Sequence, residues 1–250
     1  MWTRSELKEQ GKKALHRNYW IIVLVTFLVQ LLSGEALNAA GSSARSSADS
    51  AAYTKTFLGM IPFPFLWIVG AAFAAITVRL VYSVFAGNVF EVGGCRFFEE
   101  NSIHKTKVAL ILDGFKNGAY GRNVVTMLLR DVYSILWTLC LIIPGIVKSY
   151  EYKLIPYILA ENPEISRERA FEISKHIMDG QKWDAFVLNL SFIGWNLLSI
   201  ITLGIVGVLY VRPYMSTTWA EFYKVNRKMA LEKGIASKQE LTGLKKEMDE

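Results

Sequence analysis

The sequence predicts an all-α, polytopic membrane protein with about six transmembrane helices, arranged as three hairpins with cytoplasmic interfacial helices. Of its 250 residues, 52% are hydrophobic and the mean hydropathy is +0.26, which is too apolar for an ordinary soluble domain. Residues 185–211 contain no charged side chain, and a helix needs only about 20 apolar residues to cross a bilayer. Basic residues lie in short segments beside the apolar runs, as they do in membrane proteins.

The N-terminal region predicts a surface helix over 1–18 and a first span over about 19–33, with Tyr19 and Trp20 at the interface. A cleaved signal peptide has a similar outline, but two acidic residues in the charged region and the later spans favour an uncleaved helix. A weak apolar stripe marks one face of the surface helix and consists of Leu7, Gly11, Ala14, Leu15 and Asn18.

The next segments predict a loop, a second span and interfacial helices. Residues 34–56 are rich in Ser, Ala and Gly, which is typical of a flexible loop. The second span is expected over about 61–85. Residues 86–122 mix aromatic and charged side chains and predict one or two interfacial helices, with an amphipathic helix over 103–116.

The second half predicts two hairpins separated by an amphipathic helix. Spans over 124–143 and 146–160 turn at Pro144-Gly145, and spans over 184–200 and 204–219 turn near Leu203-Gly204. Between them, Ser166 and Gly180 are the expected ends of an amphipathic helix whose apolar residues are Ala170, Ile173, Ile177 and Met178. Residues 1–223 form one membrane domain, and 224–250 are expected to be a polar tail.

The distribution of basic residues predicts that both termini lie in the cytoplasm. Of the 28 basic residues, 21 fall in the four segments that this topology places inside: 1–18, 86–122, 161–182 and 219–250. The net charge of +6 is therefore expected to meet anionic lipids on the cytoplasmic side. No base-reading motif accompanies the charge, so a nucleic-acid partner is not expected.

A weak internal similarity indicates a duplicated unit. Residues 111–116 resemble 177–182, and each is followed by a tryptophan, a Gly-Ile-Val triplet and a Pro-Tyr pair. A duplication of one interfacial helix plus one hairpin would explain the pattern. Convergence of apolar hairpins on glycine turns and interfacial aromatics explains it equally well.

Several motifs in order resemble a bacterial integral membrane family catalogued as domain of unknown function 975. They are Leu136-Trp137, Ile142-Ile143-Pro144-Gly145-Ile146, Pro156-Tyr157-Ile158-Leu159-Ala160, Asn162-Pro163, Lys182-Trp183, Leu190-Ser191-Phe192-Ile193-Gly194-Trp195, Pro213-Tyr214 and Phe222-Tyr223. The resemblance implies a multi-pass protein of the bacterial cytoplasmic membrane. It supplies no activity, cofactor or catalytic residue.

The sequence contains no recognisable catalytic or metal-binding arrangement. The three histidines, His16, His104 and His176, have no carboxylate or cysteine at ligand spacing, and no membrane-embedded serine has a histidine partner in its span. Cys95 and Cys140 do not form a disulfide framework. No enzyme activity, metal or cofactor is therefore expected.

Charged residues inside the predicted spans are the only candidates for a polar site, because a charge within a bilayer normally faces protein or water. An Arg130–Glu161 pair is expected across the first of the two hairpins, and Lys148 and Glu151 share a helix face. The pairs either fix helix packing or line a path for protons or a charged solute. The candidates are Arg130, Asp131, Lys148, Glu151, Lys153 and Glu161.

The leading functional hypothesis is a non-enzymatic scaffold or accessory protein in envelope or transport processes, with a possible membrane protein partner. The alternative is a small transporter with a polar intramembrane site around Arg130, Asp131, Lys148 and Glu151. A lipid-modifying enzyme is a third possibility, and it would need a nucleophile and a base to meet in space.

Overall fold

The computed structural model describes residues 2–32, 63–115 and 118–242, with side chains from residue 69 onward in the second range. The regular secondary structure in these residues is entirely helical, which confirms the predicted all-α class. The predicted loop over 34–56 lies outside the described residues, as do the start of the second span and the end of the polar tail.

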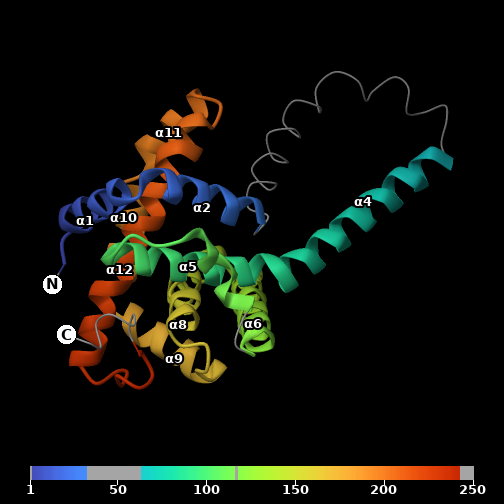
Figure 1. Cartoon of the computed structure of the whole chain (residues 1–250). Helices are drawn as coiled ribbons and strands as arrows, with labels where there is room; N and C mark the ends of the chain where they lie inside the picture. The colour runs from blue at the N-terminus through green and yellow to red at the C-terminus, as the bar shows by residue number, and fades with distance from the viewer. Residues whose placement is uncertain (1, 33–62, 116–117, 243–250) are drawn as a thin grey trace.

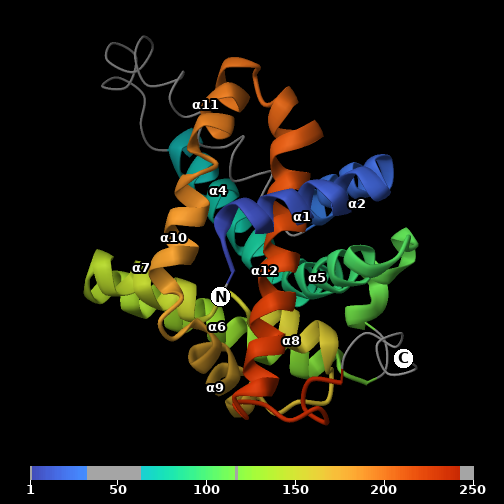
Figure 2. The same cartoon turned by 90° about the vertical axis from the view of Figure 1, so that its left-hand side faces the viewer.

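The described residues form α-helices, with one short 3₁₀-helix and two short π-helices between them (Figures 1 and 2). In chain order they are α1 Arg4–Arg17, α2 Tyr19–Leu32, α4 Phe63–Tyr82, η1 Ser83–Gly87, α5 Asn88–Ile103, η2 Val108–Phe115, α6 Tyr120–Cys140, α7 Ile142–Glu151, α8 Ile155–Glu161, α9 Arg167–Met178, α10 Lys182–Leu190, α11 Ile193–Ile201, η3 Gly207–Val211 and α12 Arg212–Glu232. Two of the short helices, η1 and η3, are π-helices that run directly into α5 and α12.

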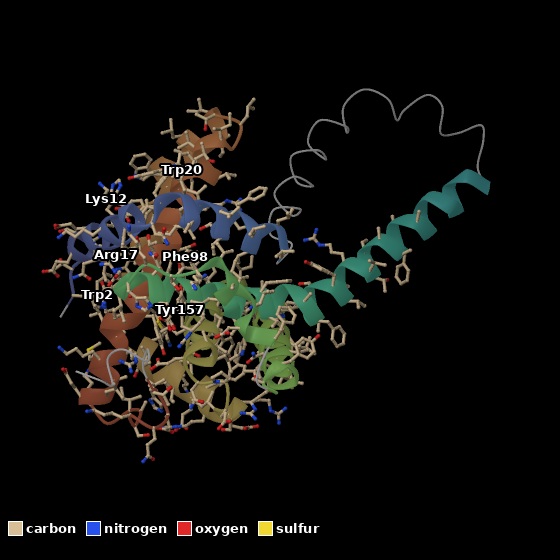
Figure 3. The ribbon with its side chains drawn as sticks, viewed as in Figure 1. Trp2, Lys12, Arg17, Trp20, Phe98 and Tyr157 are labelled. Atoms are coloured by element: carbon tan, nitrogen blue, oxygen red, sulfur yellow. The ribbon has the colours of Figure 1, made fainter. Side chains whose placement is uncertain are left out.

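Helix α1 is amphipathic as predicted, but its apolar face contacts protein rather than lipid. It begins with a capping box between Thr3 and Glu6, which satisfies backbone donors in its first turn. Leu7 and Leu15 are buried, and Gly11 brings α1 against Thr218 of α12. Between α1 and α2 the chain bends by 101°. Figure 3 shows Trp20 on the outside of this bend, far from Phe98 and Tyr157 in the interior.

Helices α4, η1 and α5 form one continuous helix with two different environments. The described side chains of α4 are largely exposed, and α4 projects from the body in Figure 1. Most of α5 is buried. The prediction of an interfacial segment after residue 85 is therefore wrong for α5, because Gly93 and Gly94 let α2 and η2 approach its backbone closely. The predicted amphipathic helix over 103–116 is instead the 3₁₀-helix η2, which covers Gly93 through Ile111.

The first predicted hairpin in the second half exists but turns earlier and ends sooner. Its break is at Leu141, whose backbone is extended, while Pro144 lies in the first turn of α7, where no backbone N–H is needed. The segment predicted as one span over 146–160 is two short helices, α7 and α8. Pro156 lies at the start of α8 and cannot donate the hydrogen bond that would continue α7.

The second predicted hairpin turns where the sequence indicates. Leu203 and Gly204 have φ angles of 50° and 87°, and they reverse the chain between α11 and η3. Helix α9 also has its predicted ends, since the Ser166 side chain caps it and Gly180 follows it with a φ of 73°. The apolar face of α9 is buried inside the protein instead of lying on lipid.

Two helical stretches are long and apolar enough to cross a membrane, Val69–Ile103 and Lys182–Ile201, and α1 with α2 adds a third if the bent pair is one span. The six predicted spans are thus not all seen as separate long helices in the described residues. Large exposed apolar side chains concentrate on α4, at the α6–α7 turn and on the α11–η3 hairpin. They include Phe73, Val78, Leu139, Ile142, Ile143, Ile200, Ile201, Leu203 and Ile205.

The segment after α12 folds back onto α9 through one ion pair. The Arg169 guanidinium donates to the Glu240 carboxylate at 2.5 Å and to the Ile235 carbonyl at 2.8 Å. Hydrogen bonds from Arg169 and from the Ser237 backbone lower the pKa of Glu240 to about 2.

Replacing Gly93 with alanine is expected to destabilise the protein by about 1–3 kcal/mol, because the new methyl group would collide with the backbone carbonyl of Ile111. Gly121→Ala is the matched control, since no atom lies within 4 Å of its Cβ position. Thermal unfolding in detergent micelles measures both. Equal melting temperatures for the two variants would contradict the close approach of α5 and η2.

Replacing Glu240 with glutamine is expected to cost about 1 kcal/mol at neutral pH, a small value because both partners are 30% exposed. The folded-state pKa of Glu240 is lowered, so the pair contributes fully above the unfolded value of about 4.3 and is lost as pH falls toward about 2. Unfolding curves of wild type and Glu240→Gln should therefore converge on acidification. The exposed Glu164→Gln variant should show no such convergence, and a difference that persisted at low pH would refute the ion pair's role.

Candidate functional site

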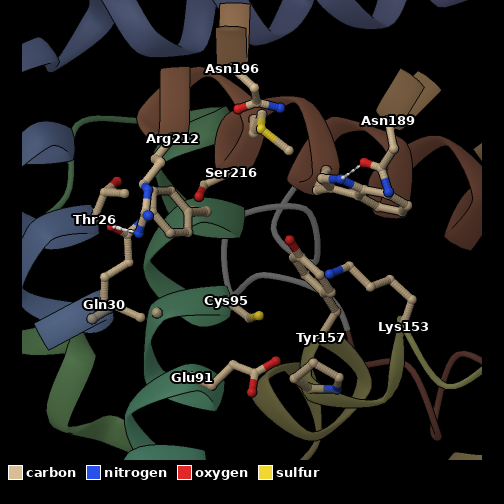
Figure 4. Close-up of a pocket in the computed structure, with 16 residues that line it drawn as sticks. Thr26, Gln30, Glu91, Cys95, Lys153, Tyr157, Asn189, Asn196, Arg212 and Ser216 are labelled. Atoms are coloured by element: carbon tan, nitrogen blue, oxygen red, sulfur yellow. Dashed lines mark hydrogen bonds between the residues drawn. The ribbon is translucent and has the colours of Figure 1, made fainter. Parts of the chain in front are cut away.

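A polar cavity of about 420 Å³, open on one side, lies between α2, α5, the start of α8, α10, α11 and α12 (Figure 4). Six helices from different parts of the chain therefore contribute to one space. The polar or titratable side chains that line it are Thr26, Gln30, Glu91, Cys95, Lys153, Tyr157, Asn189, Asn196, Arg212 and Ser216.

Two cations reach this cavity from opposite sides, as Figure 4 shows for Arg212 and Lys153. Arg212 Nη1 donates to Gln30 Oε1 at 2.5 Å, and Lys153 Nζ lies 5.4 Å from the centre of the Trp219 ring. Neither cation forms an ion pair with any carboxylate in the part of the chain that the structure describes. Both therefore keep their charge available to the cavity.

Amide side chains fix the aromatic wall of the cavity. Trp219 Nε1 donates to Asn189 Oδ1 at 3.1 Å, and Asn189 Nδ2 donates to the Tyr150 hydroxyl at 2.8 Å. The chain of hydrogen bonds holds the Trp219 ring in place beside Lys153. A cation over an indole face is stabilised without losing its charge.

Glu91 is the carboxylate among the described lining residues, and it shares one cation, Arg130, with Asp131. Arg130 donates to both of its carboxylate oxygens, at 2.8 and 3.0 Å, in a bidentate pair. Arg130 also donates to Asp131, which accepts a further hydrogen bond from Asn88 at 2.8 Å. With Lys153 and Arg212 on one side and the two carboxylates that share Arg130 on the other, the balance of charge at the cavity is positive by one.

The sequence-derived candidates fall into three separate places. Lys153 lines the cavity, and Arg130 with Asp131 supports it through Glu91. The predicted Lys148–Glu151 pair is present at 2.6 Å, and Lys182 adds a second contact to Glu151 at 2.5 Å that the sequence did not indicate. This cluster fixes α7 against the start of α10 and does not line the cavity.

The predicted Arg130–Glu161 pair is wrong. Glu161 accepts hydrogen bonds from Arg227 at 2.7 Å and from the Tyr223 hydroxyl at 2.6 Å, both on α12. The pairing assumed a straight hairpin with a turn at residues 144–145. Because the chain breaks at Leu141 and again before α8, the register of the hairpin does not extend to Glu161.

Sequence reasoning missed Glu91, Gln30 and Arg212 for one reason each. Glu91 lies in a segment whose mixed composition predicts an interfacial helix, Gln30 is one of a few uncharged polar residues in the predicted first span, and Arg212 ends an apolar run. The spacing of Glu91, Cys95 and Glu99 by four residues places them on one helix face, a signal that could have revealed a polar row on α5.

The site offers binding chemistry more clearly than it offers catalysis. Within residues 2–32, 63–115 and 118–242, no three His, Cys, Asp or Glu side chains gather closely enough to hold a metal ion. Cys95 and Cys140 are free thiols. Cations, amides and hydroxyls around a cavity are groups that orient a polar ligand.

The fold and the site together define a class of protein. In the described residues it is all-helical, some of its outer helices are apolar enough to cross a membrane, and its helices surround a polar cavity. A family model matches residues 101–230, just over half of the chain, and the chain belongs to the family described as protein of unknown function (DUF975). The resemblance seen in the sequence is thus confirmed. No curated protein and no solved structure matches the chain.

Replacing Glu151 with glutamine is expected to lower the free energy of unfolding by about 2 kcal/mol, because two lysines lose the charge that holds them to a buried position. Chemical denaturation in detergent measures the loss. Glu168→Gln, at an exposed pair on α9, is the control and should change stability by less than about 0.5 kcal/mol. An unchanged stability in Glu151→Gln would contradict a structural role for the cluster.

Proposed function

We propose that this chain is a non-enzymatic integral membrane protein of the bacterial cytoplasmic membrane that takes part in transport by binding a small anionic solute in its central cavity. The observation that carries the proposal is a pair of cations, Lys153 and Arg212, at a cavity where no described carboxylate pairs with either. Lys153 is exposed and Arg212 is half-buried, so an anion that enters the cavity from solvent is attracted by both charges.

The lining favours an anion over a cation or an apolar molecule. A cation would meet Lys153 and Arg212, while Glu91, which could attract it, is already held by Arg130. An apolar molecule would remove water from several amides and hydroxyls without replacing their hydrogen bonds. A small carboxylate or phosphate can satisfy both the charge and the donors.

Membrane orientation is part of the same proposal. The concentration of basic residues near α1, around α9 and after α12 supports cytoplasmic placement of both termini, next to anionic lipid. The exposed apolar side chains of α4 and of the two hairpin turns suit contact with lipid tails.

A scaffold or accessory role is the second candidate, and the exposure of α4 favours it. Within the described residues, α4 packs chiefly against η1, its own continuation, and presents apolar side chains such as Phe73 and Val78 on its surface. A membrane protein partner could cover this helix. The cavity has no necessary part in that role.

The natural thiol of Cys95 provides the test, because it lines the cavity. In a Cys140→Ser variant reconstituted in membrane vesicles, we expect sulfonatoethyl methanethiosulfonate, an anion, to modify Cys95 about tenfold faster than the cationic trimethylammonioethyl reagent. Lys153→Gln should reduce this preference. Mass spectrometry of the intact protein gives both rates.

A Cys95→Ser variant, with the exposed Cys140 as its one thiol, supplies the intrinsic ratio of the two reagents. A ratio at Cys95 equal to this control would refute an anion-selective cavity. A complete lack of modification at Cys95 would mean that the cavity is closed to solutes and would favour the scaffold.

A further inference from the structure

Glu99 on α5 is a buried carboxyl group without a hydrogen-bond partner among the described residues. It is 5% exposed, and among these residues neither of its carboxylate oxygens has such a partner. It is not a lining residue of the 420 Å³ cavity. An isolated carboxylate in such a position is strongly disfavoured relative to the neutral acid.

The neighbouring charges do not remove this penalty. Arg227 is the nearest cation of α12, but its Nε donates to Glu161 at 2.7 Å, and Arg96 is paired with Glu100 at 2.8 Å. Glu161 itself adds a second negative charge beside Glu99. The ionisable groups that face Glu99 or its small cavity are Arg96 and Glu100 on α5, Tyr157 and Glu161 on α8, and Tyr223, Lys224 and Arg227 on α12.

A narrow space connects Glu99 to the surface. A cavity of about 20 Å³, enough for one water molecule, lies between Glu99, Glu161 and Tyr223. Ser102, Lys224 and Arg227 line both this space and a larger groove of about 1100 Å³. We call that groove the basic groove; its cationic residues are Lys13, Arg17, Lys224, Arg227, Lys228 and Lys238.

The row of polar residues on α5 that ends at Glu99 begins at the 420 Å³ cavity. Glu91 and Cys95, which line that cavity, precede Glu99 at intervals of one helical turn on the same face of α5. Tyr157 lies within electrostatic reach of all three and stacks on Tyr223 with ring centres 5.2 Å apart. The Tyr223 hydroxyl donates to Glu161, the neighbour of Glu99. Polar groups thus follow one another from the cavity to the basic groove.

We infer that Glu99 is a proton-binding site between the central cavity and the basic groove, neutral at rest and able to exchange its proton with water. A link between proton exchange at Glu99 and binding of an anionic solute rests on the proposed function. Proton binding itself rests on the contacts of Glu99 alone. On release, the O–H bond of Glu99 breaks and the proton passes to water in the small cavity. The carboxylate left behind lies within electrostatic reach of Arg96 and Arg227, which already pair with other carboxylates, so the reverse transfer readily restores the acid.

Infrared spectroscopy of the full-length protein in lipid films tests the inference directly. At neutral pH we expect a C=O stretching band of a protonated carboxylic acid that disappears in Glu99→Gln and persists in Glu100→Gln. The band should shift within minutes when the film is exposed to D₂O. Glu99→Met, which lacks a side-chain carbonyl, assigns the band independently if the glutamine variant does not fold.

The outcomes separate this inference from the proposed function. A band that is absent from wild type, or that both Glu99 variants retain, would show that Glu99 is ionised and overturn the inference. A band that shifts in D₂O only when the whole protein unfolds would show that the Glu99 proton does not exchange with water in the folded protein. This result would also overturn the inference. Neither result changes the modification rates of Cys95, which test the anion-binding cavity separately.

Discussion

The cost of removing charges from water governs the arrangement of this protein. Its helices carry carboxylates into the interior, and three of them are held by cations that arrive from other elements: Glu91 by Arg130, Glu151 by two lysines and Glu161 by Arg227. Each pair also fixes one helix against another, so electrostatic compensation and packing coincide. Glu99 departs from this pattern, since neither of its carboxylate oxygens has a partner among the described residues, and the proton that we infer there removes its charge.

Local features of the fold could be predicted from the sequence because local chemistry determines them. The stripe of α1, the ends of α9 and the turn at Leu203-Gly204 depend on side-chain periodicity, capping and backbone freedom within a few residues. The Lys148–Glu151 pair belongs to the same group, since residues three apart share a helix face. These features do not require knowledge of which helices meet.

The cavity could not be predicted in the same way because six separate helices form it. Hydropathy assigns long apolar runs to lipid, but here short helices such as α8 are buried by protein, and α5 is interior although it carries Glu91 and Glu99. The expected Arg130–Glu161 contact failed because it extrapolated an ideal hairpin through two breaks in the helix. Charge pairing across elements follows tertiary geometry, which a single sequence does not contain.

The two π-helices change which side of α5 and of α12 faces the interior, in a way that a regular α-helix does not. Each α-helical residue advances about 100° around the axis, so one extra residue in a turn rotates everything beyond it by roughly that angle. Ser83–Gly87 lies between lipid-suited α4 and polar α5, and Gly207–Val211 stands just before Arg212. In each case the wide turn rotates the polar side chains that follow it relative to the side chains that precede it, so the two parts of one continuous helix can face different surroundings.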